Sequence, residues 1–443
     1  MAFGSLTGFF GTNSSGKSSI LQFLLMLKQT VESSDRSRVL HLGDDKSYVD
    51  LGTMYDIIYN HASPSDIKFS FGWKIPFPLG LMLFPGVNIE DEVIKTVSFY
   101  ASVRRNEDFV SLKKFGYSIN NHKKIVGVNK IKSSDNNLSS YRIFFDSFKF
   151  RDEQVTSYSV TPSKFYSFHP LFDENSWHLI YLTNQLASLL ENAFTNIQYL
   201  GPLREYPSRL YPWAGEQTQS VGNRGERAVA ALLSSRNQGP TIDMGEDQPK
   251  RTVEEHVAHW LKELGLIYSF KVQPIAPNRK EYEVRIQRTA ESASVFLTDV
   301  GFGVSQILPV LVLLFYVPEG STVILEQPEI HLHPAVQAGL ADVFIDAIKR
   351  RKVQIILESH SEHLLQRLQL RMAEKGLNPE KEFDFNQAKL YFTSIEEGKS
   401  KLTPLQLDEY GNINNWPEGF FGDTFGEAAA MLRAEMQRKM QAQ

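Results

Sequence analysis

The chain contains no cysteine among its 443 residues, which excludes disulfide bonds, thiolate metal centres and cysteine nucleophiles. It also lacks long apolar segments. The longest, at 307–317 (ILPVLVLLFYV), is too short to span a bilayer and predicts a buried helix. No basic segment precedes an apolar one near residue 1, so we expect no signal peptide, no membrane partner and a cytoplasmic location.

The sequence has no large excess of charge of one sign. Lys and Arg total 47 against 51 Asp and Glu, so no overall field attracts nucleic acid, and such binding would need a local patch. One basic cluster is interleaved with Phe109 and Tyr117. A solvated sheet face is its plainer interpretation, and a surface for nucleic acid or a partner protein is the alternative. The cluster consists of Arg104, Arg105, Lys113, Lys114, Lys123, Lys124, Lys130 and Lys132.

A glycine-rich motif at 11–18, GTNSSGKS, is the strongest functional signal. It fits the pattern GxxxxGK[ST] and lies between an apolar run at 6–10 and a helical apolar pattern at 19–30. In such a P-loop the backbone N–H groups surround phosphate, Lys17 reaches the β- and γ-phosphates, and Ser18 binds Mg²⁺. We therefore predict an ATP site that contains Asn13, Ser14, Ser15, Gly16, Lys17, Ser18 and Ser19.

A second part of the same site lies far along the chain. The apolar strand expected at 322–325 ends in Glu326, and an acid there can hold the waters around Mg²⁺. From this point strands and helices alternate, which predicts a parallel sheet. The following helices are expected at 334–350 and 362–375, and the strands at 353–357 and 390–393. Everything between the two parts must be inserted into, or wrapped around, one ATP-binding fold.

The intervening sequence changes character twice. Runs rich in aromatic and β-branched residues predict an antiparallel meander, with strands at 67–73, 96–103, 109–119, 124–131 and 141–150. Apolar residues at helical spacing then predict helices at 176–194, 224–235 and 252–265, before strands at 268–274 and 282–286.

At this length a single core is not expected, and four regions are predicted. They are a discontinuous ATPase core, a β-rich insert with a trailing helix, a helical and β subdomain, and a small C-terminal domain. The core is expected at 1–60, 197–225 and 294–400, the insert at 61–196, the subdomain at 226–293 and the C-terminal domain at 401–443.

Further features accompany Glu326. The segment 301–306, GFGVSQ, opens the apolar helix, so its amides and the Ser305 hydroxyl form a second helix N-terminus suited to phosphate. Two prolines bracket the turn after the acid, and His360 follows the next strand. This order resembles the ABC-type ATPase superfamily, in particular the stand-alone branch that contains the SMC, RecF and OLD proteins.

A narrower resemblance rests on four strings: TDVGFGVSQILPVL, EQPEIHLHP, ESHSEHLLQRLQ and YGNINNWPEGFF. They are similar to a bacterial family of predicted AAA/ABC-type ATPases that carry a small C-terminal domain of unknown function. Members of the wider group are ATPase subunits of antiphage systems such as PARIS and Septu. The resemblance implies an α/β P-loop NTPase of ABC type with a β-rich inserted lobe and a helical lobe.

The superfamily holds ATP between the P-loop of one subunit and the signature loop of another. The resemblance therefore implies that Lys17 and Ser18 face the signature loop of a second copy, in a homodimer or higher homo-oligomer. The residues of this signature loop would be Gly301, Gly303 and Ser305. His331 and His333 stand in the D-loop, and His360 is the equivalent of the switch histidine.

Gln327 departs from the superfamily pattern, which has a catalytic glutamate at this position. An amide cannot accept a proton as a general base near neutral pH. Either hydrolysis is slow and the protein is an ATP-held clamp, which we favour, or Glu329 or His360 serves the attacking water; Gln327 could still orient that water.

Two other features remain open at the level of sequence. The glutamine loop that normally contacts Mg²⁺ has only Gln198 as a candidate. The closely spaced histidines allow a zinc site as an alternative, but without cysteine its ligands would have to come from distant loops, and we prefer the D-loop and switch roles.

These observations predict an ATPase that dimerises on ATP and acts as sensor or scaffold of a bacterial antiphage complex. It would control an effector protein from a neighbouring gene. The main alternative is a RecF-like DNA-binding ATPase of repair or recombination. A third is a self-sufficient hydrolase whose insert is itself the effector.

Overall fold

The computed structural model describes residues 1–62, 66–80, 93–106, 109–120, 125–131, 140–146, 159–170, 177–245, 248–417, 420, 431 and 433–435. The chain forms two compact units. One comprises Met1–Leu21 and Ile197–Gln443, and the other Gln22–Asn196. The division falls inside helix α1 (Lys17–Glu32).

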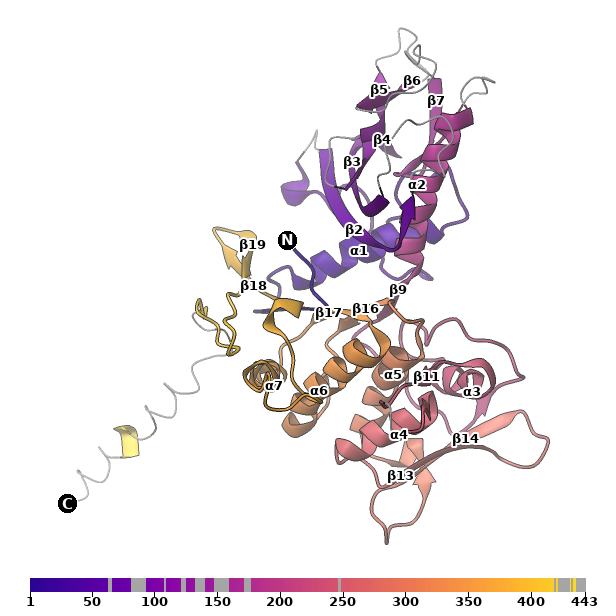
Figure 1. Cartoon of the computed structure of the whole chain (residues 1–443), viewed down its shortest axis with the longest axis vertical. Helices are drawn as coiled ribbons and strands as arrows, with labels where there is room; N and C mark the ends of the chain where they lie inside the picture. Colours follow the sequence, from indigo (N-terminus) through magenta and orange to yellow (C-terminus); the bar gives the residue numbers. More distant parts are fainter. Residues whose placement is uncertain are drawn as a thin grey trace. The chain divides into compact units, whose positions relative to one another are not determined.

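The first unit contains a six-stranded sheet with the order β19-β18-β1-β17-β16-β9 (Figure 1). Neighbouring strands run parallel, except for the antiparallel pair β18 and β19. The central strands are almost entirely apolar and buried, as is usual when a parallel sheet is covered on both faces. The strands are β1 (Leu6–Gly11), β9 (Ile197–Leu200), β16 (Thr322–Glu326), β17 (Gln354–Glu358), β18 (Ala388–Glu396) and β19 (Lys399–Pro404).

Three helices share a core with this sheet. Helix α5 (Phe302–Tyr316) is apolar on every side and almost wholly buried, which confirms the helix predicted from the longest apolar run. Helices α6 (Pro334–Arg351) and α7 (Glu362–Ala373) begin where His333 and Ser361 cap them by accepting hydrogen bonds from backbone N–H groups.

Strand alternation decides which side chains leave this core. Leu325 of β16 and Leu357 of β17 belong to it, so the next residues, Glu326 and Glu358, point to the opposite face. The two acids are paired in register and end their strands. They therefore meet at the carboxyl edge of the sheet, where β1 leads into the P-loop.

A smaller lobe of the first unit precedes α5 in the sequence. Buried histidine His256 and the indole of Trp260, both on α4, bond the Asp346 carboxylate on α6 at 2.7 and 2.9 Å, which fixes the lobe to the core. A sheet with the order β10-β14-β13, with β15 beside β14, and the pair β11-β12 complete it. Its elements are β10 (Tyr211–Pro212), α3 (Ala228–Gln238), β11 (Thr241–Ile242), β12 (Arg251–Thr252), α4 (Val253–Glu263), β13 (Ser269–Pro274), β14 (Glu281–Gln287) and β15 (Val295–Phe296).

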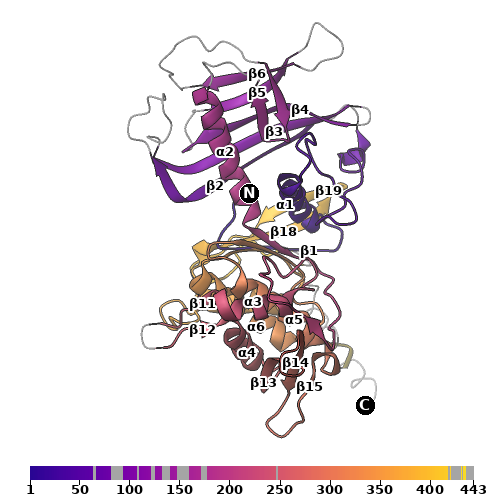
Figure 2. The same ribbon diagram turned by 90° about the vertical axis from the view of Figure 1, so that its right-hand side faces the viewer.

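The second unit is a seven-stranded antiparallel meander in which β2 to β8 follow one another in sequence order. Figure 2 shows the part from β2 to β6. Its core is aromatic and includes the buried rings of Phe99, Phe115, Tyr117 and Phe165. The elements are β2 (Asp66–Gly80), β3 (Val93–Asn106), β4 (Phe109–Ile119), β5 (Ile125–Ile131), β6 (Ser140–Asp146), β7 (Ser159–Ser163), β8 (Ser167–Pro170) and α2 (Trp177–Thr195).

Most elements predicted from periodicity are present. The strand predicted at 109–119 coincides with β4, and the predicted long helices and parallel strands are found with their ends shifted by a few residues. The short strands β7, β8, β9, β10, β11, β12, β15 and β19 were not predicted, because a few residues carry no measurable period. Residues 124 and 147–150 of two predicted strands lie outside the described part of the chain.

Among the described residues, no helix combines the length and the apolar composition that crossing a bilayer requires.

Candidate functional site

The P-loop adopts the turn that its sequence predicts. It joins β1 to α1, and three of its residues, Gly11, Ser14 and Gly16, have positive φ angles of 137°, 60° and 95°. Lys17 is only 3% exposed, and its Nζ donates to the carbonyl oxygens of Gly11 at 3.1 Å and Thr12 at 2.7 Å. Burial lowers the pKa of Lys17, which nearby Glu358 opposes. The loop therefore presents one desolvated cation at its centre.

Residues of strands β18 and β19 contact the P-loop. The hydroxyls of Ser15 and Thr393 are 2.5 Å apart, and Thr393 also donates to the Phe10 carbonyl. Gly16 has a φ of +95°, which favours glycine, and a Cβ there would also lie 2.7 Å from the Ser400 hydroxyl. The C-terminal hairpin thus fixes the loop's shape, although the sequence predicted no role for it in the site.

Two acids stand at the strand ends beside the loop. The Ser18 hydroxyl donates to Glu358 Oε1 at 3.1 Å, and the Tyr199 hydroxyl donates to Glu326 Oε1 at 3.0 Å. Glu358 is the nearer partner of the P-loop because β17 separates β16 from β1. Sequence reasoning selected Glu326 and missed Glu358, although both end an apolar strand.

Burial governs the protonation of both acids. It raises the pKa of Glu326 to about 7, an effect to which the neighbouring charge of Glu358 adds and which the Tyr199 hydrogen bond opposes. Burial also raises the pKa of Glu358, against the influence of Ser18 and Lys17. The second oxygen of Glu358 is buried and has no hydrogen-bond partner among the described residues. A cation near these oxygens would relieve both effects.

The site fits Mg²⁺ if the nucleotide supplies part of its coordination. No three His, Asp or Glu side chains in the described part of the chain converge closely enough to form a metal cluster. Mg²⁺ commonly uses one or two carboxylates together with phosphate oxygens and water. Ser18, Glu358 and Glu326 would hold it here, and the ion would neutralise charge on the phosphates.

The residues considered for activating the attacking water, Gln327, Glu329 and His360, follow the two strand-end acids in the sequence. Gln327 has a positive φ of 44°, rare for a side chain of this kind, and its N–H donates to the Glu358 carbonyl. Glu329 is 6% exposed, and its Oε1 accepts a hydrogen bond from the His360 N–H at 2.7 Å. Burial raises the pKa of Glu329, while burial and the charge of Lys17 lower that of His360. Burial thus shifts the titration of both side chains toward the uncharged form, and the two residues are joined by the hydrogen bond from the His360 N–H.

The predicted signature-loop and D-loop residues form a neighbouring group. Gly301 is the N-cap residue of α5, and a Cβ built on it would have no atom within 4 Å. Among the side chains that the structure describes, none accepts a hydrogen bond from the N–H groups of the first helical turn. The Ser305 hydroxyl donates to the Phe302 carbonyl inside that turn. Phe302 is 43% exposed, and its ring packs edge-on against His331 at 5.3 Å. This group therefore presents free helix amides next to an exposed aromatic ring.

Two other residues singled out in the sequence are His333, predicted for the D-loop, and Gln198, the candidate for the glutamine loop. His333 is exposed and caps α6 through Nδ1. Gln198 lies within β9 opposite Val323, which places it short of the carboxyl edge. At that edge, the loop after β9 contributes Arg204 instead, whose Nη2 lies 3.4 Å from the Glu326 carbonyl oxygen.

The described members of the basic cluster are largely engaged within the second unit. Arg104 and Lys113 both bond the Asp66 carboxylate, at 2.5 and 2.7 Å. Lys114 and Arg105 lie over tyrosine rings. Lys123, Lys124 and Lys132 lie outside the described residues. Asp66 thus offsets part of the charge that would attract a phosphate backbone.

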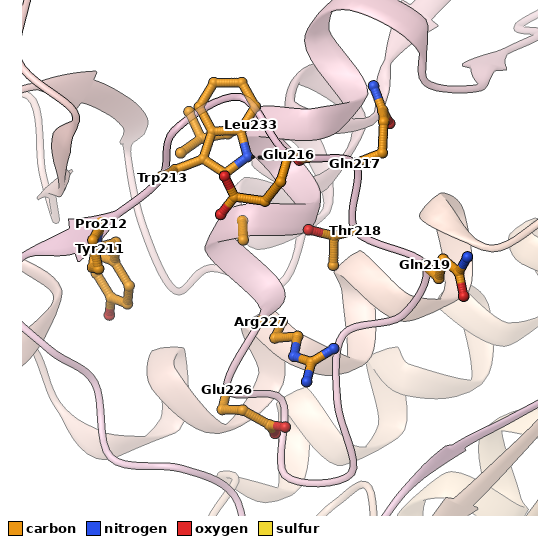
Figure 3. A pocket seen from close by; sticks show the side chains of 11 residues that line it. Tyr211, Pro212, Trp213, Glu216, Gln217, Thr218, Gln219, Glu226, Arg227 and Leu233 are labelled. Carbon is orange, nitrogen blue, oxygen red and sulfur yellow. Dashed lines mark hydrogen bonds between the residues drawn. The ribbon is translucent and has the colours of Figure 1, made fainter.

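A cavity of about 570 Å³ lies elsewhere in the first unit (Figure 3). Within it the Trp213 indole N–H donates to the Glu216 carbonyl. None of its lining residues belongs to the P-loop or the strand ends, so it is separate from the candidate ATP site. They are Tyr211, Pro212, Trp213, Glu216, Gln217, Thr218, Gln219, Glu226, Arg227, Ala230 and Leu233.

Comparison with known families matches two segments. Residues 242–365 match the AAA ATPase domain, and residues 384–431 match a protein family of unknown function, DUF3696. The first segment contains α5, both acids and His360; the second contains β18 and β19. No curated protein matches the chain.

Solved structures similar to the chain include SMC head domains. One, bound to the C-winged helix domain of ScpA, is 11% identical, covers 92% of this chain and 93% of its own, and has a TM-score of 0.40. The SMC head domain from Thermotoga maritima is 11% identical over 92% of both chains, with a TM-score of 0.34. A Pyrococcus furiosus SMC head bound to the C-terminal domain of ScpA gives the same values.

The parallel sheet, the P-loop and the AAA match together confirm the predicted α/β P-loop fold and the ATPase class. The β-rich and helical lobes that were predicted are also present.

Removing the Glu358 charge tests its role toward Mg²⁺. We expect Glu358→Gln to weaken ATP binding in Mg²⁺ by at least about tenfold, because a carboxylate ligand is lost. Binding in EDTA should be unchanged or slightly tighter, since repulsion of the phosphates falls. Calorimetric titration with and without Mg²⁺ measures both, and Glu380→Gln, on an exposed residue, is the control. Equal weakening in both conditions would contradict a metal role.

Proposed function

We propose that the protein binds MgATP at the P-loop and that two copies close around the nucleotide. The observation that carries this proposal is the assembly of Lys17, Ser18, Glu358 and Glu326 at one edge of the sheet. It combines a desolvated cation for phosphate with hard oxygen ligands for Mg²⁺.

The exposed group at the start of α5 supports closure by a second copy. The first N–H groups of the helix have no side-chain cap, and such groups bind anions. Gly301 and Gly303 leave room for close approach, and the exposed Phe302 ring offers apolar contact. In the proposed dimer Gly301, Gly303 and Ser305 contact the nucleotide held by the partner, and His331 lies at the interface.

Slow hydrolysis is the second part of the proposal. Gln327 occupies the turn directly after Glu326 and cannot serve as a base. Glu329 Oε1 is engaged by the His360 N–H, and burial, together with the charge of Lys17, lowers the pKa of His360 and so weakens it as a base. ATP would therefore persist long enough to hold two copies together.

The biological role that we propose is a sensor or scaffold of an antiphage complex, whose effector is encoded by a neighbouring gene. The sequence resemblance supports this role. The family of unknown function matched at 384–431 agrees with the small C-terminal region on which that resemblance partly rests. A RecF-like DNA-binding ATPase remains the competing function.

Nucleotide-dependent dimerisation tests the first part. Light scattering should show a monomer that becomes a dimer with MgATP. Lys17→Ala should abolish ATP binding and the dimer. Gly301→Glu should abolish the dimer through repulsion of the partner's phosphates, yet leave ATP binding to the monomer intact, because its side chain enters open space. Gly301→Ala is the matched control. A Gly301→Glu protein that dimerises normally, or tight ATP binding by Lys17→Ala, would contradict the arrangement.

Restoring a carboxylate tests the second part. Gln327→Glu should raise steady-state ATP turnover by about tenfold or more, since a positioned base contributes ~10²–10⁴-fold. Phosphate release at saturating ATP is the measurement. An unchanged or lower rate would indicate that Glu329 or His360 already serves the water, and Glu329→Gln would then identify which.

Purification from cells that carry the native gene neighbourhood tests the biological role. The scaffold should retain the neighbouring gene product in a fixed ratio that nuclease treatment does not change. The RecF-like function predicts instead DNA binding that weakens with salt and disappears when the cluster is neutralised. The residues to neutralise are Lys113, Lys114, Lys123 and Lys124.

A further inference from the structure

Arg204 is a buried cation whose hydrogen-bonding capacity is mostly unused. Its side chain is 6% exposed. Nη2 lies 3.4 Å from the Glu326 carbonyl oxygen, and Nε and Nη1 have no partner among the described residues. Burial lowers the pKa of its guanidinium to about 10, although Tyr199, Glu326 and Glu329 oppose this.

A buried guanidinium without an acidic partner lowers the stability of the folded protein unless a ligand compensates its charge. Each buried donor without a partner loses its hydration without compensation. The nearby carboxylates do not accept from it: Glu326 Oε1 accepts from Tyr199, and Glu329 Oε1 accepts from the His360 N–H. The donors of Arg204 are therefore available to a ligand that enters between these groups.

Its position identifies the ligand. Arg204 follows β9, which is parallel to β16, so it joins Glu326 and Glu358 at the carboxyl edge on the far side of the acids from the P-loop. A planar guanidinium with two free N–H directions matches the oxygens of a phosphate group. The guanidinium would repel a cationic ligand, and it bonds an anion more strongly than a neutral acceptor.

We propose that Arg204 binds the terminal phosphate of ATP and so makes the site selective for the triphosphate over the diphosphate. This inference rests on the proposed ATP site. Lys17 holds the phosphates from the P-loop, and Arg204 holds the last one from the opposite side. ADP lacks the group that Arg204 binds.

The same segment connects the site to the proposed dimer surface. The N–H groups of Gly201 and Glu205 donate to the carbonyls of Asn223 and Arg224. That turn contains Gly225, where a Cβ would lie 2.4 Å from Pro309 of α5. The loop that carries Arg204 is thereby packed onto the helix whose N-terminus would meet the partner.

Exposed apolar residues flank Arg204 on this loop. Leu203 and Tyr206 are both 72% exposed, and the Tyr206 ring packs against Phe302 at 5.7 Å. Arg204 therefore lies on the same segment as part of the proposed dimer surface.

The test compares nucleotide selectivity with stability. Titration calorimetry in Mg²⁺ should show that Arg204→Met weakens binding of the non-hydrolysable analogue AMP-PNP by about tenfold or more, while ADP binding changes by less than about twofold. Arg204→Lys should keep part of the selectivity because it keeps the charge. Arg224→Met is the control, since the Arg224 carbonyl accepts from the N–H of neighbouring Glu205, but its side chain is exposed and pairs with Glu205.

The melting temperature without nucleotide separates binding from a structural role. It should stay equal or rise in Arg204→Met, because the variant removes an unpaired buried charge. A lowered melting temperature with unchanged selectivity would overturn the proposal, as would equal loss of AMP-PNP and ADP binding. A wild-type protein that binds neither nucleotide would instead contradict the ATP site itself.

Discussion

The parallel pairing of β1, β17, β16 and β9 is the constraint on which the site depends. Parallel strands end at the same edge, so the P-loop, two carboxylates and the loop of Arg204 converge there although they come from four distant parts of the sequence. The register matters as much as the order. A shift of one residue between β16 and β17 would turn one acid into the helical core.

The second constraint on the candidate site is the balance of buried charges at the carboxyl edge of the sheet. In the described part of the chain, the buried cations beside Glu326, Glu329 and Glu358 are Lys17 and Arg204. Burial therefore pushes the pKa of each carboxyl upward, and the arginine keeps unused donors. Such an arrangement is poorly compensated by itself and well compensated by a metal ion together with a polyphosphate. In the proposed site, bound MgATP would supply the compensation that the protein's own groups do not.

The C-terminal hairpin has a structural function that follows from its contacts. β18 lies beside β1, and Thr393 and Ser400 pack on the turn of the P-loop. The segment matched to a family of unknown function therefore completes the sheet that carries the ATP site. Its separation from the P-loop in the sequence conceals this role, because no local pattern records which strand will become a neighbour.

The sequence alone determined the features that depend on short-range patterns. The P-loop at 11–18, the buried helix α5 and the strand–helix alternation after residue 322 follow from residue spacing, because backbone conformation and amphipathicity are local. Tertiary structure alone decided that Glu358 contacts Ser18, that Gln198 falls short of the edge while Arg204 reaches it, and that Thr393 supports the P-loop. These contacts depend on strand order and register, which are set by the packing of the whole sheet rather than by any one segment.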